Sequence, residues 1–357
     1  MSNTIKVLIA FLLLLSTTAT KAQADLKQYL QTHHYAISLE SGFAGAVADT
    51  LKQKLKDYKL ILQAEGGSHY LDFYTRLPIT WLRFLNENFG VTHFFLESGH
   101  TSDILLNKYL QTGDTGYIVG DKRFWQSLYD YNERVGDQRK LKYFGIDFER
   151  VRTYVKALKT LLPATIPPAA INAEIKLIKN ANDTLKDCDY ILQINNKLQK
   201  AIAANRKHFE MYFGDRYSDL EMVVFNKGNC KDVYKNRNNN LAESFLAFDR
   251  QFNREMYYGE LGEAHTVLIN NNFASKISNS AAFKNKVCVV NLYCYNCTTP
   301  QEAVSNWPLA KIEKELLQQF LPFCTADFTL FDLTGSSELV KKYAAYGQFL
   351  IIAKEQH

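Results

Sequence analysis

The sequence predicts a mixed α/β fold, in which a mixed central sheet is flanked by helices. Short apolar segments of strand length recur along the chain, at residues 59–63, 91–96, 141–147, 256–260, 286–293, 327–333 and 348–353. Helical patterns separate most of these segments, an alternation typical of layered α/β proteins. From about residue 150 to 255 the pattern is almost entirely helical. We expect this stretch to be a helical insertion that covers one edge of the sheet.

The first 24 residues have the order of a secretory signal. Lys6 is followed by an apolar run from Val7 to Leu15, a polar stretch and small residues that end at Ala24. The apolar run is too short to span a bilayer comfortably. We therefore expect residues 1–24 to be a signal peptide, and residues 25–357 to be an exported α/β domain that is periplasmic or extracellular and makes no stable membrane insertion after cleavage.

Composition excludes one class of partner and favours an enzyme-sized globular body. The formal net charge is +5, and the basic residues are scattered among acidic ones without a basic stripe. This balance argues against a nucleic-acid partner. The chain is 46% hydrophobic and 13% aromatic over 357 residues, which is enough to bury a large core.

Six cysteines are compatible with disulfides in an oxidising compartment, but spacing alone does not give the pairing. Cys294 and Cys297 have the spacing of a redox or zinc pair. They lack a second pair or a nearby histidine, so a disulfide or plain buried thiols are the better interpretation.

Two consecutive strand–turn–helix units place acids and imidazoles after a strand. In the first, an apolar strand ends at Gln63 and the turn from Glu65 to His69 (EGGSH) contains two glycines, which permit a tight turn. In the second, the apolar run 91–96 is followed directly by Glu97 and then by His100. Ligands of open α/β sheets bind at the carboxyl ends of the strands, so these side chains form a candidate site.

Two later segments repeat this arrangement. The strand over 141–147 ends in Asp147, and the segment 256–265 (MYYGELGEAH) runs from a strand-like piece into Glu263 and His265. A neutral imidazole can take a proton from water while a carboxylate orients it, which is general-base chemistry. The sequence contains no G-x-S-x-G elbow, no phosphate-binding P-loop and no H-E-x-x-H motif. A serine hydrolase is therefore not indicated.

Five blocks of the chain, in this order, resemble the erythromycin esterase-like proteins over most of residues 25–357. They are residues 81–97 (WLRFLNENFGVTHFFLE), 107–114, 128–147, the helix start 237–243 (RNNNLAE) and 262–267 (GEAHTV). The resemblance implies an α/β hydrolase that cleaves a cyclic ester with a histidine as general base for water, without a covalent serine. It also implies a small-molecule ester or lactone as substrate, and no cofactor or metal.

The resemblance assigns roles to individual residues. His69 matches the general-base histidine, Glu97 a strand-end glutamate that orients it or the water, and His265 a histidine that polarises the carbonyl or binds the leaving oxygen. Five further residues are candidates for substrate binding or support: Glu65, Arg76, His100, Asp147 and Glu263. We expect the three catalytic side chains to face one pocket at the carboxyl edge of the sheet.

Three other functions stay open. Gly66, Pro78 and Gly262 stand where the family has glutamate, arginine and histidine, so the protein could be an inactive relative that acts as a binding or scaffold protein. The string Gly262-Glu-Ala-His265 resembles a turn of haem-binding iron-uptake proteins, which implies a haem-binding protein. The third alternative is a metal hydrolase built on the three catalytic candidates.

Overall fold

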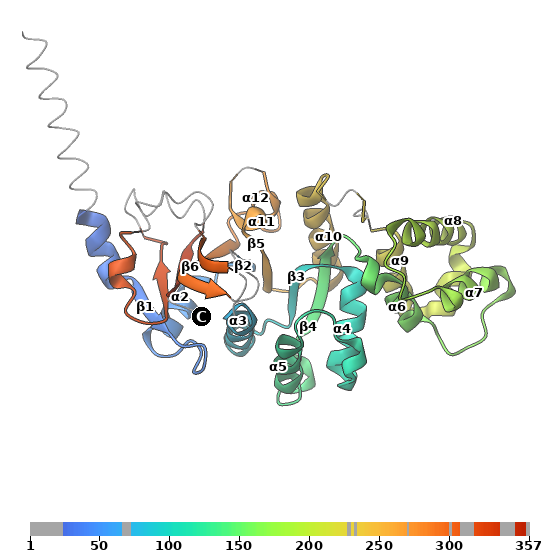
Figure 1. Ribbon diagram of the computed structural model, residues 1–357, viewed down its shortest axis with the longest axis horizontal. Coiled ribbons are helices and arrows are strands. Elements are labelled where there is room, and N and C mark those ends of the chain that lie inside the picture. The colour runs from blue at the N-terminus through green and yellow to red at the C-terminus, as the bar shows by residue number, and fades with distance from the viewer. Residues whose placement is uncertain are drawn as a thin grey trace, which may run out of the picture. The chain divides into compact units, whose positions relative to one another are not determined.

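The computed structural model describes residues 24–65, 73–226, 230–231, 234–269, 271–299, 302–307, 318–335 and 347–354, with only the backbone described for 296–307. The protein is a mixed α/β protein with a mixed sheet flanked by helices, as the sequence predicts (Figure 1). The chain folds into two compact units. Unit 1 comprises residues 1–74, 262–278 and 283–357, and unit 2 comprises residues 75–261 and 279–282.

Unit 1 contains most of the strands. They are β1 (His34–Ile37), β2 (Leu60–Glu65), β6 (Val287–Thr299), β7 (Glu302–Trp307), β8 (Phe328–Asp332) and β9 (Phe349–Lys354). Their order is β1-β8-β9-β6-β2, with β7 paired to β6. Strand β6 runs parallel to β2 and β9, whereas β8 is antiparallel to both β1 and β9. Strands β2, β8 and β9 are almost entirely buried, as are residues 287–294 of β6, which suits a sheet covered on both faces.

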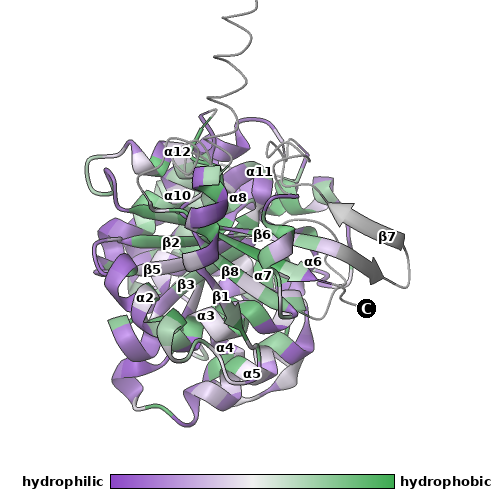
Figure 2. Ribbon diagram, turned by 90° about the vertical axis from the view of Figure 1, so that its left-hand side faces the viewer, coloured by the Kyte–Doolittle hydropathy of each residue, from purple (hydrophilic) through white to green (hydrophobic). Residues whose placement is uncertain are grey.

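Helices pack on the unit 1 strands through apolar faces. They are a helical segment over residues 24–32, α2 (Ala46–Leu55), α11 (Glu263–Thr266) and α12 (Phe273–Ser278). Leu26 and Leu30 share an apolar cluster with Phe331, Leu350 and Ile352. Figure 2 shows hydrophobic colour along the strands and alternating hydrophobic and hydrophilic residues along the helices. This is the pattern expected of helices that bury one face.

Unit 2 is built on three parallel strands in the order β5-β3-β4. They are β5 (Tyr257–Gly262, to Leu261 in this unit), β3 (His93–Gly99) and β4 (Lys142–Asp147). Its helices are α3 (Phe73–Phe89, from Thr75 in this unit), α4 (His100–Thr112), α5 (Lys122–Asn132), α6 (Val151–Leu161), α7 (Asn172–Asn180), α8 (Cys188–Phe213), α9 (Tyr217–Val224) and α10 (Arg237–Phe252).

The described residues between 151 and 252 form helices and the loops that connect them. These helices differ in what they pack against. Helices α6 to α9 share one apolar cluster of their own, which includes Leu158, Ile194 and Leu220. Helix α10 instead packs on the sheet, where Phe248 lies 4.5 Å from the ring of Phe144 in β4. The long helical stretch of the sequence therefore contains both a separate helical core and a helix that covers a sheet face.

Side chains, rather than another strand, satisfy the outer edge of β4. The amide of Asn107 pairs with the backbone of Tyr143, accepting from its N–H at 3.0 Å and donating to its carbonyl at 2.6 Å. One turn earlier in α4, Asp103 accepts a hydrogen bond from the N–H of Gly145 at 3.1 Å. Because an open strand edge invites pairing with other chains, this cover protects unit 2 and fixes α4 against β4.

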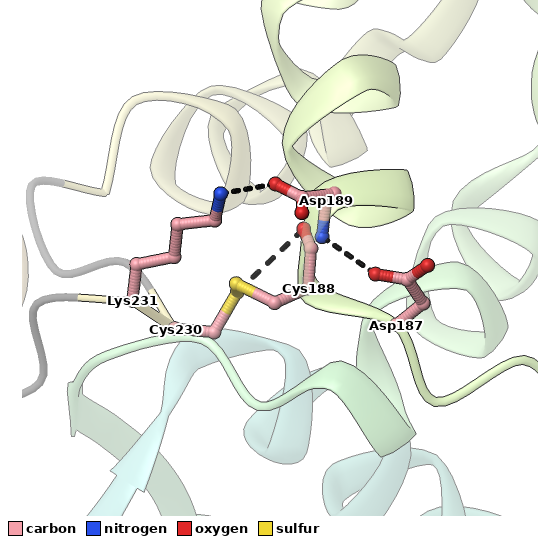
Figure 3. Close-up of a disulfide and its surroundings, with 5 residues drawn as sticks. All are labelled: Asp187, Cys188, Asp189, Cys230 and Lys231. Carbon is pink, nitrogen blue, oxygen red and sulfur yellow. Dashed lines mark hydrogen bonds and ion pairs between the residues drawn. A yellow bond between two sulfur atoms is a disulfide. The ribbon is translucent and has the colours of Figure 1, made fainter.

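The structure gives one of the cysteine pairings that the sequence leaves open. Cys188 at the start of α8 and Cys230 in the connection before α10 form a disulfide (Figure 3). Cys294 is also disulfide-bonded, whereas Cys288 and Cys324 are buried free thiols. The disulfide ties the α9–α10 connection to α8, and an ion pair between Lys231 and Asp189 reinforces the same link.

Candidate functional site

Two of the predicted acids meet at the carboxyl ends of neighbouring strands in unit 2. Strands β3 and β4 are parallel, with Leu96 opposite Gly145 and, after a register shift, Gly99 opposite Asp147. Glu97 and Asp147 therefore reach the same strand edge, although 50 residues of sequence separate them. This edge is where open α/β sheets bind ligands.

An arginine joins the two acids into what we name the Arg237 cluster: Glu97, Asp147 and Arg237. The Arg237 Nη2 donates to Glu97 Oε1 at 2.5 Å and to Asp147 Oδ2 at 2.5 Å, and its Nε donates to Asp147 Oδ1 at 3.1 Å. The side chains are 15% exposed for Arg237, 25% for Glu97 and 2% for Asp147. Burial opposes the charge of Arg237, but hydrogen bonds and charges from Asp147 and then Glu97 raise its pKa.

Aromatic and cationic groups lie beside the cluster. The ring of Phe148 lies beneath the guanidinium groups of Arg237 and Arg150, with centroid distances of 5.6 Å and 5.9 Å. Arg150 also donates to the backbone carbonyl of Glu97 at 3.0 Å. The guanidinium groups of Arg237 and Arg150 therefore both lie against this strand end, where Arg237 binds Glu97 and Asp147.

A third acid, Glu149, holds the start of α4. Its two oxygens accept the backbone N–H groups of His100 and Thr101, each at 2.9 Å. Gly99 permits this close approach, because a Cβ there would lie 2.5 Å from the carbonyl oxygen of Phe148. The N-terminal N–H groups of a helix require such an acceptor. Glu149 rather than Glu97 therefore caps this helix.

Asn226, in the loop between α9 and α10, binds the same strand end through its side-chain amide. Its Nδ2 donates to Glu149 Oε1 at 2.7 Å and to the backbone carbonyl of Asp147 at 2.9 Å. It precedes Cys230 by four residues, so the disulfide to Cys188 restrains the segment that supplies this amide. The connection thus contributes to fixing the end of β4.

His100 lies in a separate arrangement of charges. Its Nδ1 is 2.5 Å from Asp103 Oδ2, and its Nε2 is 3.6 Å from Asp219 Oδ1. Burial alone lowers the pKa of His100, but the carboxylates of Asp103 and Asp219 outweigh it and raise the pKa to about 10. At neutral pH this side chain is an imidazolium ion, which can donate hydrogen bonds but cannot accept a proton.

The remaining predicted residues are distributed between the units. Glu65 ends β2 in unit 1, and Glu263 and His265 lie on α11, which packs against β2 in the same unit. His265 is buried. Arg76 is an exposed residue of α3 in unit 2. His69 lies outside the described residues.

Three residues of the unit 2 strand end were not among the sequence-predicted site residues: Glu149, Asn226 and Arg237. Arg237 opens the block 237–243 that carries part of the family resemblance, so a signal for it existed. Nothing in the local sequence indicates that Glu149 caps a helix 49 residues earlier. Within the part of the chain that the structure describes, no three His, Cys, Asp or Glu side chains are grouped so as to hold a metal ion.

Comparisons with known proteins give a likeness of fold alone. No family model matches the chain, and no curated protein matches it significantly. A Bacillus cereus protein of solved structure is similar with a TM-score of 0.65 and 11% identity over 94% of this chain and 98% of its own. A succinoglycan biosynthesis protein gives the same TM-score and identity over 94% and 97%. An erythromycin esterase mutant in its open conformation gives a TM-score of 0.52 and 12% identity over 87% and 93%.

None of the described helices combines the length and apolarity needed to cross a bilayer.

Proposed function

We propose that the protein is an exported hydrolase, a divergent relative of the erythromycin esterases, which uses a histidine to activate water against an ester or lactone. In this proposal His69 is the general base, Glu97 orients it or the water, and His265 polarises the carbonyl or binds the leaving oxygen. Glu65, Arg76, His100, Asp147 and Glu263 would bind substrate or support the site.

The observation that carries the proposal is the Arg237 cluster. It fixes the carboxylate of Glu97, partly exposed, at the carboxyl end of a buried strand, where burying charges is costly unless they are paired. An ionised glutamate fixed by a guanidinium group is a suitable orienting partner for an imidazole base. The fold likeness to an erythromycin esterase is compatible with this chemistry.

The cluster also narrows the role of Glu97. Because Arg237 already binds one of its oxygens, Glu97 is better suited to orienting a histidine or a water molecule than to taking the proton itself. This leaves the proton transfer to His69.

Export is the second part of the proposal, and it predicts the mature N-terminus. Protein secreted by a host with a functional export system should begin at Asp25, as determined by mass spectrometry of the recovered chain. An uncleaved N-terminus on protein recovered from the periplasm would contradict the signal peptide.

The mechanism is tested by steady-state hydrolysis of a panel of esters and lactones. His69→Ala should reduce kcat by about 10²–10⁴-fold, the usual contribution of a general base. His208→Ala, at an exposed histidine of α8, is the matched control and should leave kcat unchanged. Serine-directed sulfonyl fluorides should not inhibit the wild type.

Two outcomes would contradict the proposed function or favour another one. Full activity of His69→Ala would exclude the general-base role of that histidine. A wild type inactive on the entire panel would favour the binding or scaffold protein, and a Soret band on addition of haem would identify the haem-binding alternative.

A further inference from the structure

A cavity in unit 2 lies along α4, and the argument for its ligand does not depend on the proposed hydrolase. We name it the α4 cleft. Its volume is ≈ 440 Å³, and its walls come from α4, the end of α6, α9 and α10 over the edge of β4. Residues of one α4 face line it from His100 to Gln111, a span of about 16 Å at the rise of an α-helix. Cavities of this size hold small molecules in other proteins.

At the inner end of the cleft, the carboxylate of Asp219 lies beside the buried pair His100 and Asp103. His100 is 5% exposed and is paired through Nδ1 with Asp103, which is 3% exposed. Asp219 lies 3.6 Å from the other ring nitrogen, too far for a direct hydrogen bond, and its side chain is 40% exposed. His100 therefore faces Asp219 without a direct hydrogen bond, which leaves the Asp219 oxygens able to accept from a ligand.

The outer end of the cleft is cationic. Lys108 and Arg216 are exposed there, and neither has an acidic partner within ion-pair distance among the described residues. Arg216 uses one nitrogen, Nη1, to donate to the carbonyls of Leu161 and Leu162. The amide side chains of Gln111 and Gln251 also line the cleft and add donors and acceptors.

Aromatic rings form the middle of the cleft. Phe248 stacks on Phe252 with centroids 5.7 Å apart and an interplanar angle of 11°, and it also contacts Phe144. Phe144 and Phe248 are each 2% exposed, whereas Phe252 is partly exposed and offers an apolar surface for the C–H face of a ring-shaped ligand. The cleft thus requires a hydrogen-bond donor at its inner end, an apolar ring face in its middle and an anion at its outer end.

We propose that the α4 cleft binds an acidic sugar, a pyranose ring that carries a carboxylate. The carboxylate lies at Lys108 and Arg216, a ring hydroxyl donates to Asp219, and the other hydroxyls reach Gln111 and Gln251. A pyranose combines the C–H face and the several hydroxyl groups that this lining can use. An arylcarboxylate would match the rings and the cations but would leave the polar side chains without partners.

The experiment is a titration of the purified full chain with D-glucuronate, followed by ¹H–¹⁵N NMR of the side-chain amides of Gln111 and Gln251. We expect saturable shifts of both amides at millimolar sugar. D-Glucose, which lacks the carboxylate, and phenylacetate, which lacks the hydroxyls, should each bind at least about ten-fold more weakly, since each loses charge-assisted or neutral hydrogen bonds.

Matched variants place the binding in the cleft. Lys108→Gln and Asp219→Asn should each weaken glucuronate binding by about ten-fold or more. Lys207→Gln and Asp215→Asn, at exposed residues outside the cleft lining, should leave it unchanged. Circular dichroism and the thermal midpoint establish that each variant is folded.

Three results would overturn the proposal. They are the absence of saturable binding of glucuronate up to high millimolar concentration, equal binding of phenylacetate, and binding that Lys108→Gln and Asp219→Asn leave intact. None of these results depends on whether the protein hydrolyses an ester.

Discussion

Replacing Arg237 with methionine should destabilise unit 2 by about 3–5 kcal/mol, because it leaves a buried carboxylate without its partner. The side chain of Asp147 is 2% exposed, and among the described residues Arg237 is the only side chain that binds its carboxylate. An ionised carboxyl group in that position must lose its charge or recruit water, and either costs free energy. Glu97, which is 25% exposed, adds little to the cost.

Arg206 provides a matched control for Arg237→Met. It also pairs with two acids, Glu210 and Glu221, but its side chain is 59% exposed. Because exposed ion pairs contribute little, Arg206→Met should lower the free energy of unfolding by no more than about 1 kcal/mol. Adding Asp147→Asn to Arg237→Met should restore part of the loss, since the unpaired charge is then absent.

The assay is urea unfolding followed by tryptophan fluorescence. Trp81 and Trp125 are in unit 2 and Trp307 is in unit 1, so a Trp307→Phe background makes the signal report on unit 2. If Arg237→Met and Arg206→Met cost the same, or if Asp147→Asn restores nothing, then the Arg237 cluster does not neutralise a buried charge and the reasoning is refuted.

Three further predictions concern stability. The pKa of His100 is raised to about 10 because the facing carboxylates outweigh burial, so the free energy of unfolding should fall as pH rises from about 6.5 towards 10, and His100→Gln should flatten this slope in urea titrations at several pH values. Gly99→Ala should cost about 1–3 kcal/mol, because its Cβ would overlap backbone, whereas Gly136→Ala has open space and should cost little in the same assay. Replacing Cys188 and Cys230 with alanine should lower the free energy of unfolding by about 2–4 kcal/mol, measured against the oxidised wild type.

Most strands could be predicted from the sequence, because their hydrophobic residues form runs that only a buried strand explains. The runs at 59–63, 91–96 and 286–293 correspond to β2, β3 and β6 in the structure. Strand β1 was not predicted, since its four residues, HYAI, show no clear alternation and it is stabilised by antiparallel pairing with β8, far along the chain. Pairing of that kind leaves little trace in local sequence.

The sequence could predict only those site residues that lie at the ends of strands. Because parallel strands align their carboxyl ends, the positions of Glu97 and Asp147 followed from finding two strands. The partner that joins them could not be predicted in this way, since Arg237 lies 90 residues after Asp147 and its role depends on where α10 begins. The role of Asn226 depends on a disulfide whose pairing spacing alone does not give.

The structure also separates two tasks that a glutamate could perform at this strand end. A glutamate just before a helix can cap that helix, or it can serve a site at the strand end. Glu149 provides that cap with both of its oxygens and is almost fully buried, so α4 does not need the carboxylate of Glu97. Glu97 instead stays partly exposed and is fixed by Arg237. Because partly exposed ion pairs contribute little to the free energy of unfolding, the fold gains little from this charge. A charged group that the fold does not require, placed where α/β proteins bind ligands, is the strongest structural argument that this strand end has a function.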